Sequence, residues 1–218
     1  MARLIKSGIG WGVPYEPPPE LAGLSLSEIA ALAHERRLPP LDQWTPAHSG
    51  ESHMVIRADG TWLHEGGPIN RPAMVRAFSS LLMRDENGQH WLVTPHERLA
   101  IAVEDAAFIA IDMEARPDPT QSGSAQGGTV LAFRLNTDDI VLCGPENPLR
   151  VAGTPDQPAF YLAVRHGTEA RLNRSTYAQL IEHALAKAGP DADPAHLTVE
   201  SRGARFPLVP ALMPAPGA

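Results

Sequence analysis

The chain contains a single cysteine and no long apolar run. Cys143 alone cannot form an intramolecular disulfide or a multi-cysteine metal site, and its apolar neighbours predict a buried structural thiol. Nowhere do 18 apolar residues follow one another, so we expect no membrane-spanning helix and no membrane partner. The first residues lack an apolar stretch of signal-peptide length, which makes a cytoplasmic location the expectation.

Lysine is also scarce. Of the 18 basic residues only Lys6 and Lys187 are lysines, and the remainder are arginines. Glycine and proline are abundant as well, with 18 and 22 residues, which indicates GC-rich codon usage rather than selection for anion binding. The formal net charge of −7 argues against nucleic acid as a partner, because nucleic-acid-binding proteins usually present a basic face.

The motifs of several enzyme classes are missing. The sequence has no Gly-x-Ser-x-Gly, no complete phosphate-binding loop, and no kinase or dinucleotide-binding pattern. His34-Glu35 and His96-Glu97 lack the second histidine that a His-Glu-x-x-His zinc motif requires. We therefore predict neither a metal nor another cofactor.

The composition is typical of a globular protein. Apolar residues make up 43% and charged residues 20% of the 218-residue chain, which is long enough for one large or two small domains. The first 23 residues are rich in glycine and proline and are expected to be an extended lead-in. A helix is expected over 25–38, because Ser25 and Glu28 have capping-box spacing and Pro39 follows its end.

A short pattern occurs twice, as Ile69-Asn70-Arg71 and as Leu172-Asn173-Arg174. In each copy a glycine-turned pair of strands precedes it, and an amphipathic helix and two further strands follow. The copies span about residues 54–103 and 160–209. Such self-similarity predicts one ββαββ unit used twice, with a cleft where the copies meet. We accordingly divide the chain into residues 1–105 and 106–218.

The predicted elements give an α+β protein with antiparallel sheets and helices packed on one face. Strands are expected at 54–57, 61–64, 90–94, 99–104, 108–113, 129–135, 140–143, 160–165, 168–172, 197–200 and 204–209. The tight turn Asp59-Gly60 joins the first pair. Helices are expected where Met74 to Leu82 and Tyr177 to Leu185 show helical apolar periodicity, and a loop is expected over 116–128.

Seven short motifs occur in order between about residues 35 and 209: Asp59-Gly60-Thr61-Trp62, Gly67-Pro68-Ile69-x-Arg71, Thr94-Pro95-x-Glu97, Val103-Glu104-Asp105, Val164-Arg165, Arg171-x-x-Arg174-x-x-Tyr177 and Ser201-x-Gly203-x-x-Phe206. Together they resemble the uncharacterised bacterial family called domain of unknown function 1285. The resemblance implies a duplicated core, a C-terminal part loosely similar to pleckstrin-homology-like folds, an effector pocket at the domain interface and a role in signal transduction. It implies no catalytic residue. Asn136-Thr137 departs from the threonine–asparagine order expected there.

Arg71 and Arg174 occupy equivalent places in the two copies, each at the start of a helix. A helix start offers unpaired backbone N–H groups and the positive end of the helix dipole, so both arginines are candidates for holding an anion in a shared cavity. Alternatively, each arginine ties its helix to a sheet-edge carbonyl or to an acid such as Asp105. Asn70 and Asn173 are predicted helix caps.

Two arginines alone bind an anion weakly. A charge-assisted hydrogen bond contributes about 1.5–3 kcal/mol and a helix terminus about 0.3–1 kcal/mol, whereas micromolar binding needs about 8 kcal/mol after the cost of association. Micromolar affinity therefore also requires an aromatic ring in the interface that stacks on the ligand. Trp62 and Trp91 are candidates for this role, and packing in the core is the alternative for both. The full set of candidate ligand-binding residues is Arg71, Arg174, Trp62, Trp91, Thr94, Asp105 and Arg165.

Three functions stay open. The first is a module that binds a small anionic effector between the two copies, favoured in part by the family resemblance. The second is a protein-interaction scaffold without a ligand, which predicts an exposed apolar patch or a free sheet edge. The third is an enzyme that uses Glu97, Glu104 and Asp105 as acid and base or around a divalent ion. Neighbouring residues of a strand point to opposite faces, so Glu104 and Asp105 share a site only if the chain bends.

Overall fold

The computed structural model describes residues 41–118, 128–154, 157–189, 193 and 196–209. The lead-in over 1–23, the helix predicted over 25–38 and the tail after Val209 lie outside these residues. Within them, no helix is long and apolar enough to cross a membrane.

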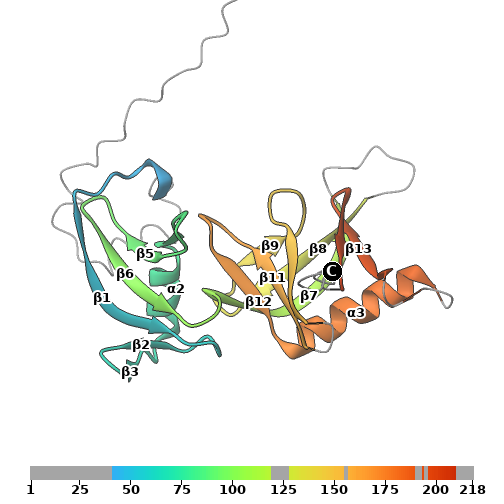
Figure 1. The fold of residues 1–218 in the computed structure, drawn as a ribbon, viewed down its shortest axis with the longest axis horizontal. Coiled ribbons are helices and arrows are strands. Elements are labelled where there is room, and N and C mark those ends of the chain that lie inside the picture. Colours follow the sequence, from blue (N-terminus) through green and yellow to red (C-terminus); the bar gives the residue numbers. More distant parts are fainter. Residues whose placement is uncertain (1–40, 119–127, 155–156, 190–192, 194–195, 210–218) are drawn as a thin grey trace, which may run out of the picture.

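Two six-stranded sheets lie side by side (Figure 1). After a short 3-10 helix, η2 (Leu41–Gln43), the first sheet contains β1 (His48–Ile56), β2 (Trp62–His64), β3 (Gly67–Pro68), β4 (Leu82–Arg84), β5 (His90–Val93) and β6 (Glu97–Val103), in the order β3-β2-β1-β6-β5-β4. The second contains β7 (Phe108–Pro117), β8 (Thr129–Leu135), β9 (Ile140–Leu142), β10 (Leu149–Thr154), β11 (Gln157–Ala163) and β12 (Glu169–Leu172), in the order β10-β11-β12-β7-β8-β9. The division at residues 105 and 106 stays a prediction.

Both sheets have the same topology. The first and sixth strands of each unit form the central pair, β1 with β6 and β7 with β12, and both pairs are parallel. The other neighbouring strands are antiparallel, so each sheet consists of two three-stranded meanders joined at the centre. With the two helices of the described residues, α2 (Pro72–Ser79) and α3 (Arg174–Ala188), this arrangement confirms the α+β class and an internal duplication.

The duplicated unit differs from the predicted ββαββ unit, and the sheets are mixed rather than antiparallel. The helix α2 follows the third strand of the first unit, whereas α3 follows the sixth strand of the second unit, so the two helices are not counterparts. The strands after α3, β13 (Thr198–Ser201) and β14 (Ala204–Pro207), form a separate two-stranded sheet. The same local pattern of strand, arginine and helix occurs at both α2 and α3. It does not show which strands pair, because long-range packing decides that. The likeness to pleckstrin-homology-like folds stays a prediction.

The helix α2 is shorter than its apolar periodicity predicts. The hydroxyls of Ser79 and Ser80 donate hydrogen bonds to the carbonyl oxygens of Arg76 and Ala77, at 2.8 and 2.6 Å. Such bonds satisfy carbonyls that a continuing helix would use, and the helix ends there. Leu82, predicted to be helical, instead begins β4 and pairs with β5.

The two predicted caps behave differently. The side chain of Asn173 accepts a hydrogen bond from the Thr176 N–H at 2.8 Å, which confirms it as the cap of α3. The cap position of α2 is Arg71, which makes no side-chain capping bond, so the prediction for Asn70 was wrong. In α2 the proline that follows Arg71 sets the first turn without a capping side chain.

Three strands were not predicted, and others are longer than predicted: β1 and β11 begin earlier, at His48 and Gln157, and β7 ends later, at Pro117. The strands β3, β4 and β10 are absent from the expected set, and all three lie at sheet edges. The predicted loop over 116–128 begins too early, because Arg116 and Pro117 pair with Val130 and Thr129 at the end of β7.

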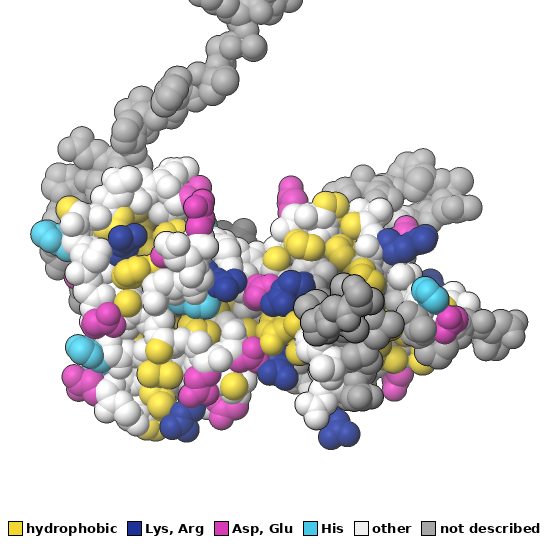
Figure 2. All heavy atoms as spheres, viewed as in Figure 1, with side chains coloured by type: hydrophobic (Ala, Val, Ile, Leu, Met, Phe, Trp, Pro, Cys, Tyr) yellow, Lys and Arg dark blue, Asp and Glu magenta, His cyan; other side chains and the backbone are white. Residues whose placement is uncertain are grey.

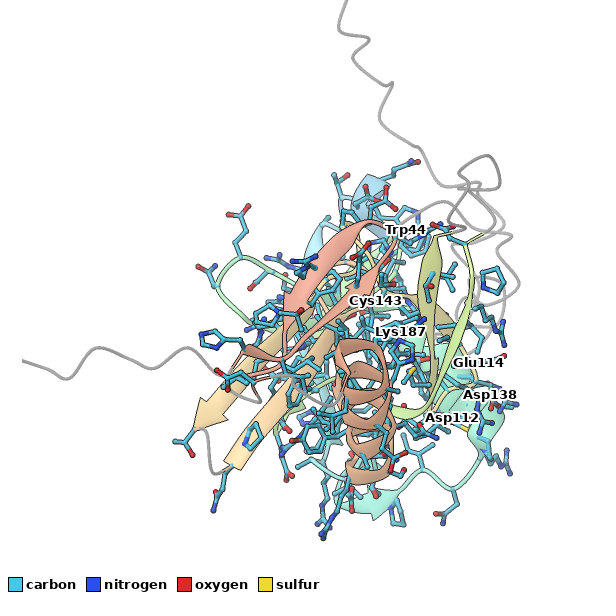
Figure 3. All side chains as sticks on the ribbon, turned by 90° about the vertical axis from the view of Figure 1, so that its right-hand side faces the viewer. Trp44, Asp112, Glu114, Asp138, Cys143 and Lys187 are labelled. Atoms are coloured by element: carbon cyan, nitrogen blue, oxygen red, sulfur yellow. The ribbon has the colours of Figure 1, made fainter. Side chains whose placement is uncertain are left out.

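Buried apolar side chains of both sheets belong to one continuous core. Among the largest fully buried side chains are Phe108, Phe133 and Phe160 of the second sheet and Trp62 of the first. The helix α3 packs against β7 and β12, and Figure 3 shows it in front of the strands of the second sheet. The two sheets therefore share apolar packing as well as the polar contacts described next.

Candidate functional site

The linker between the two sheets, residues 104–107, is attached to the second sheet through Asp105. The Asp105 carboxylate accepts a hydrogen bond from the Tyr161 hydroxyl on β11 at 2.7 Å and forms an ion pair with Arg171 on β12. The Asp105 side chain is only 17% exposed. Burial and the bond to Asp105 raise the pKa of Tyr161, and the same carboxylate raises the pKa of Arg171. The Asp105 side chain thus connects the linker to both β11 and β12.

The predicted turn between β1 and β2 contacts the second sheet. Gly60 has a φ of +84°, and its N–H donates to the Arg57 carbonyl oxygen at 2.9 Å. A β-carbon at Gly60 would lie 2.9 Å from Asn136 Nδ2 and 3.0 Å from Ile109 Cγ1. Asn136 also bonds the backbone of Ile109 twice, donating at 2.8 Å and accepting at 3.1 Å. The turn at Asn136 is therefore hydrogen-bonded to β7, the strand that the β1–β2 turn contacts.

Arg165, between β11 and β12, joins the end of α2 to the second sheet. It donates to the Ser79 carbonyl oxygen at 3.1 Å and pairs with Asp139 at 3.3 Å. Its guanidinium also lies 5.0 Å from the centroid of the Phe108 ring. The predicted site residue Arg165 is thus engaged in holding the two units together.

The edge strand β4 meets the turn between β11 and β12. The Arg84 N–H donates to the His166 carbonyl oxygen at 2.8 Å. At Gly167, whose φ is +75°, a β-carbon would lie only 2.6 Å from the Arg84 carbonyl oxygen. Acidic and basic side chains gather along this seam between the sheets on the face shown in Figure 2.

Two hollows open at the seam. One, of about 220 Å³, is lined by β4, β5, the linker and β10 to β12, and we call it the linker pocket. Its charges are largely paired: Arg150 donates two bonds to Glu169, at 2.9 and 2.8 Å, and covers the Tyr161 ring at 4.4 Å. Burial, and then the neighbouring Arg84, lower the pKa of His90. The linker pocket offers little net attraction to an anion.

His90 gives a pH-dependent contribution to stability. Its folded-state pKa lies below the unfolded value, so below about pH 6.5 the unfolded chain binds a proton that the folded chain does not. We expect stability to fall as the pH drops from about 7.5 to about 5.5, and His90→Gln to reduce this fall. Burial also lowers the pKa of His166 and His183, so part of the dependence will remain. Thermal unfolding across this range tests the prediction, and equal slopes in both proteins would contradict it.

The second hollow at the seam has a volume of about 350 Å³ and lies between the β1–β2 turn and the start of α3. We call it the turn pocket. Asp59 belongs to one wall, and Phe160, Arg171, Arg174 and Tyr177 belong to the other. The rings of Phe160 and Tyr177 stack with centroids 4.9 Å apart. Arg171 pairs with the linker carboxylate, whereas Arg174 forms no ion pair within the described part of the chain. The half-buried Tyr177 ring, backed by the buried Phe160 ring, thus lies beside an uncompensated cation.

A third hollow, of about 460 Å³, lies away from the seam between the second half of α3 and β13. We call it the hairpin pocket. Ala184, Leu197 and Val199 are its buried apolar residues, and Lys187, labelled in Figure 3, also lines it. Burial and the charge of Lys187 lower the pKa of His183. None of the predicted site residues lines this pocket.

The structure does not bring Arg71 and Arg174 into one cavity. Arg174 lines the turn pocket, while Arg71 is exposed at the start of α2 and lines none of the three pockets. Asp105 lines the linker pocket, and its partner Arg171 lines the turn pocket. The convergence predicted from the repeated pattern fails because the two helices follow different strands of their units.

Three further predicted residues serve the first sheet and line none of these pockets. Trp62 is 2% exposed and stacks on Phe78 of α2. Trp91 on β5 donates to the Asp85 carboxylate at 2.9 Å. The buried Thr94 hydroxyl shapes the turn before β6, accepting from the Glu97 N–H at 3.1 Å. Core packing, the alternative given for the tryptophans, describes Trp62, whereas Thr94 has a turn role that was not predicted.

Sequence reasoning missed Asp59, Phe160, Arg171 and Tyr177 as pocket residues. A usable signal for Tyr177 was present in the spacing Arg174-x-x-Tyr177, because residues three apart on a helix share a face. Arg171 belongs to β12, so helical spacing does not apply to it. The alternation along β11 places Phe160 on the buried face beside Tyr177.

The three carboxylates of the enzyme hypothesis do not share a site. Glu97 begins β6 and Glu104 follows its end, about 23 Å apart by the rise per residue of a strand. The Glu104 carboxylate accepts from the Ala58 N–H at 2.9 Å, and Asp105 is engaged with the second sheet. No paired-carboxylate geometry results.

Nucleophilic and metal chemistry have little basis in the described residues. Cys143 is buried, and its burial raises the pKa of the thiol to about 12. No group of three or more histidine, cysteine, aspartate or glutamate side chains gathers as metal ligands among the residues described.

Comparisons with known proteins agree with the sequence resemblance. A family model described as "Domain of unknown function (DUF1285), N-terminal domain" matches residues 39–106, and one described as "Protein of unknown function (DUF1285), C-terminal domain" matches residues 107–208. A crystal structure of a DUF1285 family protein from Silicibacter pomeroyi DSS-3 is 38% identical with a TM-score of 0.66, over 79% of this chain and 88% of that chain. A second, from Shewanella baltica OS155, is 22% identical with a TM-score of 0.48, over 61% and 93%. The comparison with curated proteins found no match. The chain belongs to the DUF1285 family.

Proposed function

We propose that this protein is a small-effector-binding module whose ligand carries an anionic group and binds in the turn pocket. The observation that carries the proposal is the pairing of the stacked rings of Phe160 and Tyr177 with Arg174, which has no ion-pair partner among the described residues. The pocket supplies both parts that affinity requires, a charge-assisted contact and an aromatic surface.

The volume supports a small ligand. A hollow of about 350 Å³ is near the lower end of the range of about 300–1,000 Å³ that small-molecule sites occupy. The smaller linker pocket is less suitable for an anion because Glu169 neutralises Arg150 and Asp105 faces it. The turn pocket is therefore the better candidate.

A role in signal transduction is part of the proposal. The two walls of the turn pocket come from different sheets, so a ligand that contacts both walls favours one arrangement of the sheets. This is the property that an effector module requires. A cytoplasmic location stays a prediction.

The alternative of a ligand-free scaffold has less support. It predicts a contiguous exposed apolar patch or a free sheet edge. The sheets do end in edge strands, such as β3 and β9, but these are only two and three residues long. Among the described residues the large apolar side chains that are well exposed are Ile140 on β9 and Leu185 on α3, at 50% and 44%. They come from separate elements, and scattered apolar residues are ordinary on a protein surface.

The proposal predicts that Arg174→Ala weakens binding of 3-phenylpropanoate, an anion with an aromatic ring. Loss of one charge-assisted contact corresponds to about a ten- to hundredfold weaker affinity. Isothermal titration calorimetry on the wild type and the variant measures it.

Arg71→Ala is the matched control, because Arg71 is also an exposed arginine at a helix start but lines none of the three pockets. We expect its affinity to stay within about twofold of the wild type. Equal weakening by both variants would contradict the turn pocket as the site. Absence of binding of both 3-phenylpropanoate and its amino-acid counterpart would contradict the function.

A further inference from the structure

We propose that the ligand of the turn pocket is a zwitterion of amino-acid type with an apolar or aromatic side chain. The inference rests on the proposed function and names its ligand class. Its carboxylate would bind Arg174, its ammonium group would bind Asp59 on the opposite wall, and its side chain would lie against the stacked rings.

The charges of the two walls carry the argument. Arg171 is already matched by Asp105, which contacts it from the linker. Arg174 on one wall and Asp59 on the other have no ion-pair partner within 4.0 Å among the described residues. A ligand with one charge of each sign therefore satisfies both walls, whereas a simple anion leaves a carboxylate facing it across a small hollow.

Asp59 is held in place by its turn. Its Oδ1 accepts a hydrogen bond from the Thr61 N–H at 2.9 Å. This bond is also the main reason that the pKa of Asp59 is lowered, so the side chain is ionised at neutral pH. The next residue, Gly60, packs against Ile109 and Asn136, which fixes the turn on the second sheet.

Apart from Asn173, the remaining residues that line the pocket are mainly apolar or aromatic. Ile109 and Pro158 join the stacked rings of Phe160 and Tyr177 along the wall formed by the second unit. An apolar side chain buried there increases affinity in proportion to the apolar area that it covers, and a small zwitterion such as glycine has no such side chain. The pocket therefore favours an amino acid with a sizeable apolar side chain.

Three compounds of the same shape test the inference. L-phenylalanine carries both charges, 3-phenylpropanoate lacks the ammonium group, and 2-phenylethylamine lacks the carboxylate. We expect the wild type to bind L-phenylalanine at least about tenfold more tightly than either analogue, the value of one charge-assisted contact. Calorimetric titrations give the three affinities.

Asp59→Asn isolates the acidic wall, because asparagine can still accept the Thr61 hydrogen bond that shapes the turn. This variant should bind L-phenylalanine and 3-phenylpropanoate within about twofold of each other, with no loss in affinity for 3-phenylpropanoate. Asp85→Asn is the control: Asp85 also accepts backbone N–H bonds in a hairpin turn, from Asn87 and Gln89, but lines none of the three pockets. It should keep the wild-type preference.

The outcomes separate the two proposals. If 3-phenylpropanoate binds as tightly as L-phenylalanine to the wild type and Arg174→Ala weakens it, the anion site stands and the zwitterion is excluded. If Asp85→Asn abolishes the preference as Asp59→Asn does, the acidic wall of the turn pocket is not its source and the inference falls. If neither compound binds, the proposed function fails and the inference fails with it.

Discussion

Replacement of Gly167 by alanine should lower the free energy of unfolding by about 2–5 kcal/mol. Two costs add. The φ of +75° at Gly167 is unfavourable for any residue with a β-carbon, and that β-carbon would lie 2.6 Å from the Arg84 carbonyl oxygen. Arg84 is on β4 of the first sheet, and Gly167 is in the β11–β12 turn of the second. The clash would therefore weaken the packing between the two sheets.

Gly66→Ala separates the two costs. Gly66 has a similar φ of +81°, but a β-carbon there would meet no atom within 4 Å. It should therefore lose only about 1–2 kcal/mol, the cost of the left-handed conformation. Urea unfolding followed by tryptophan fluorescence measures both variants. Equal losses would mean that the close approach of Gly167 to Arg84 contributes nothing to stability in solution.

The elements that could be predicted from the sequence are those set by neighbouring residues. The Asp59-Gly60 turn follows from the freedom of glycine at positive φ, and α3 follows from its apolar periodicity together with Asn173 before it and Gly189 after it. The end of α2 was not predictable from periodicity. The apolar stripe runs on to Leu82, but the hydroxyl bonds of Ser79 and Ser80 end the helix before it, and Leu82 pairs with β5 instead.

The topology could not be predicted from the repeated pattern. Leu172-Asn173-Arg174 and Ile69-Asn70-Arg71 each lead from a strand into a helix, and this much is local. Each central parallel pair joins the first and the last strand of its unit, such as β1 and β6. A short sequence motif contains no information about a pairing between strands so far apart in the chain. A true duplication was therefore predicted with the wrong unit.

The candidate site was predictable only in part. Arg174 lines the turn pocket because it begins α3 directly after β12. The two tryptophans do not line the turn pocket: Trp62 stacks on Phe78 of α2, and Trp91 bonds to Asp85 of its own hairpin. Sequence alone does not show which face of a sheet is covered. The aromatic surface instead comes from Phe160 and Tyr177.

Removal of the Asp105 carboxylate should affect stability and binding in opposite directions. Asp105→Ala leaves the Tyr161 hydroxyl and Arg171 without their acceptor, which should cost about 2–3 kcal/mol of unfolding free energy. The value is smaller than for a fully buried ion pair because the Arg171 side chain is 43% exposed. Tyr161→Phe, which removes only the hydroxyl, should cost about 1 kcal/mol, and the double variant should cost less than the sum.

The same substitution adds a positive charge to the turn pocket. Arg171 lines that pocket, and without Asp105 its guanidinium is no longer neutralised from the linker side. The affinity for 3-phenylpropanoate should therefore rise, by up to about tenfold, in a protein that has become less stable. Tyr161→Phe is the control, since it weakens the linker contact but leaves the charge of Asp105 in place. Unchanged affinity in Asp105→Ala would show that Arg171 does not reach the ligand, and would leave Arg174 as the cation that holds it.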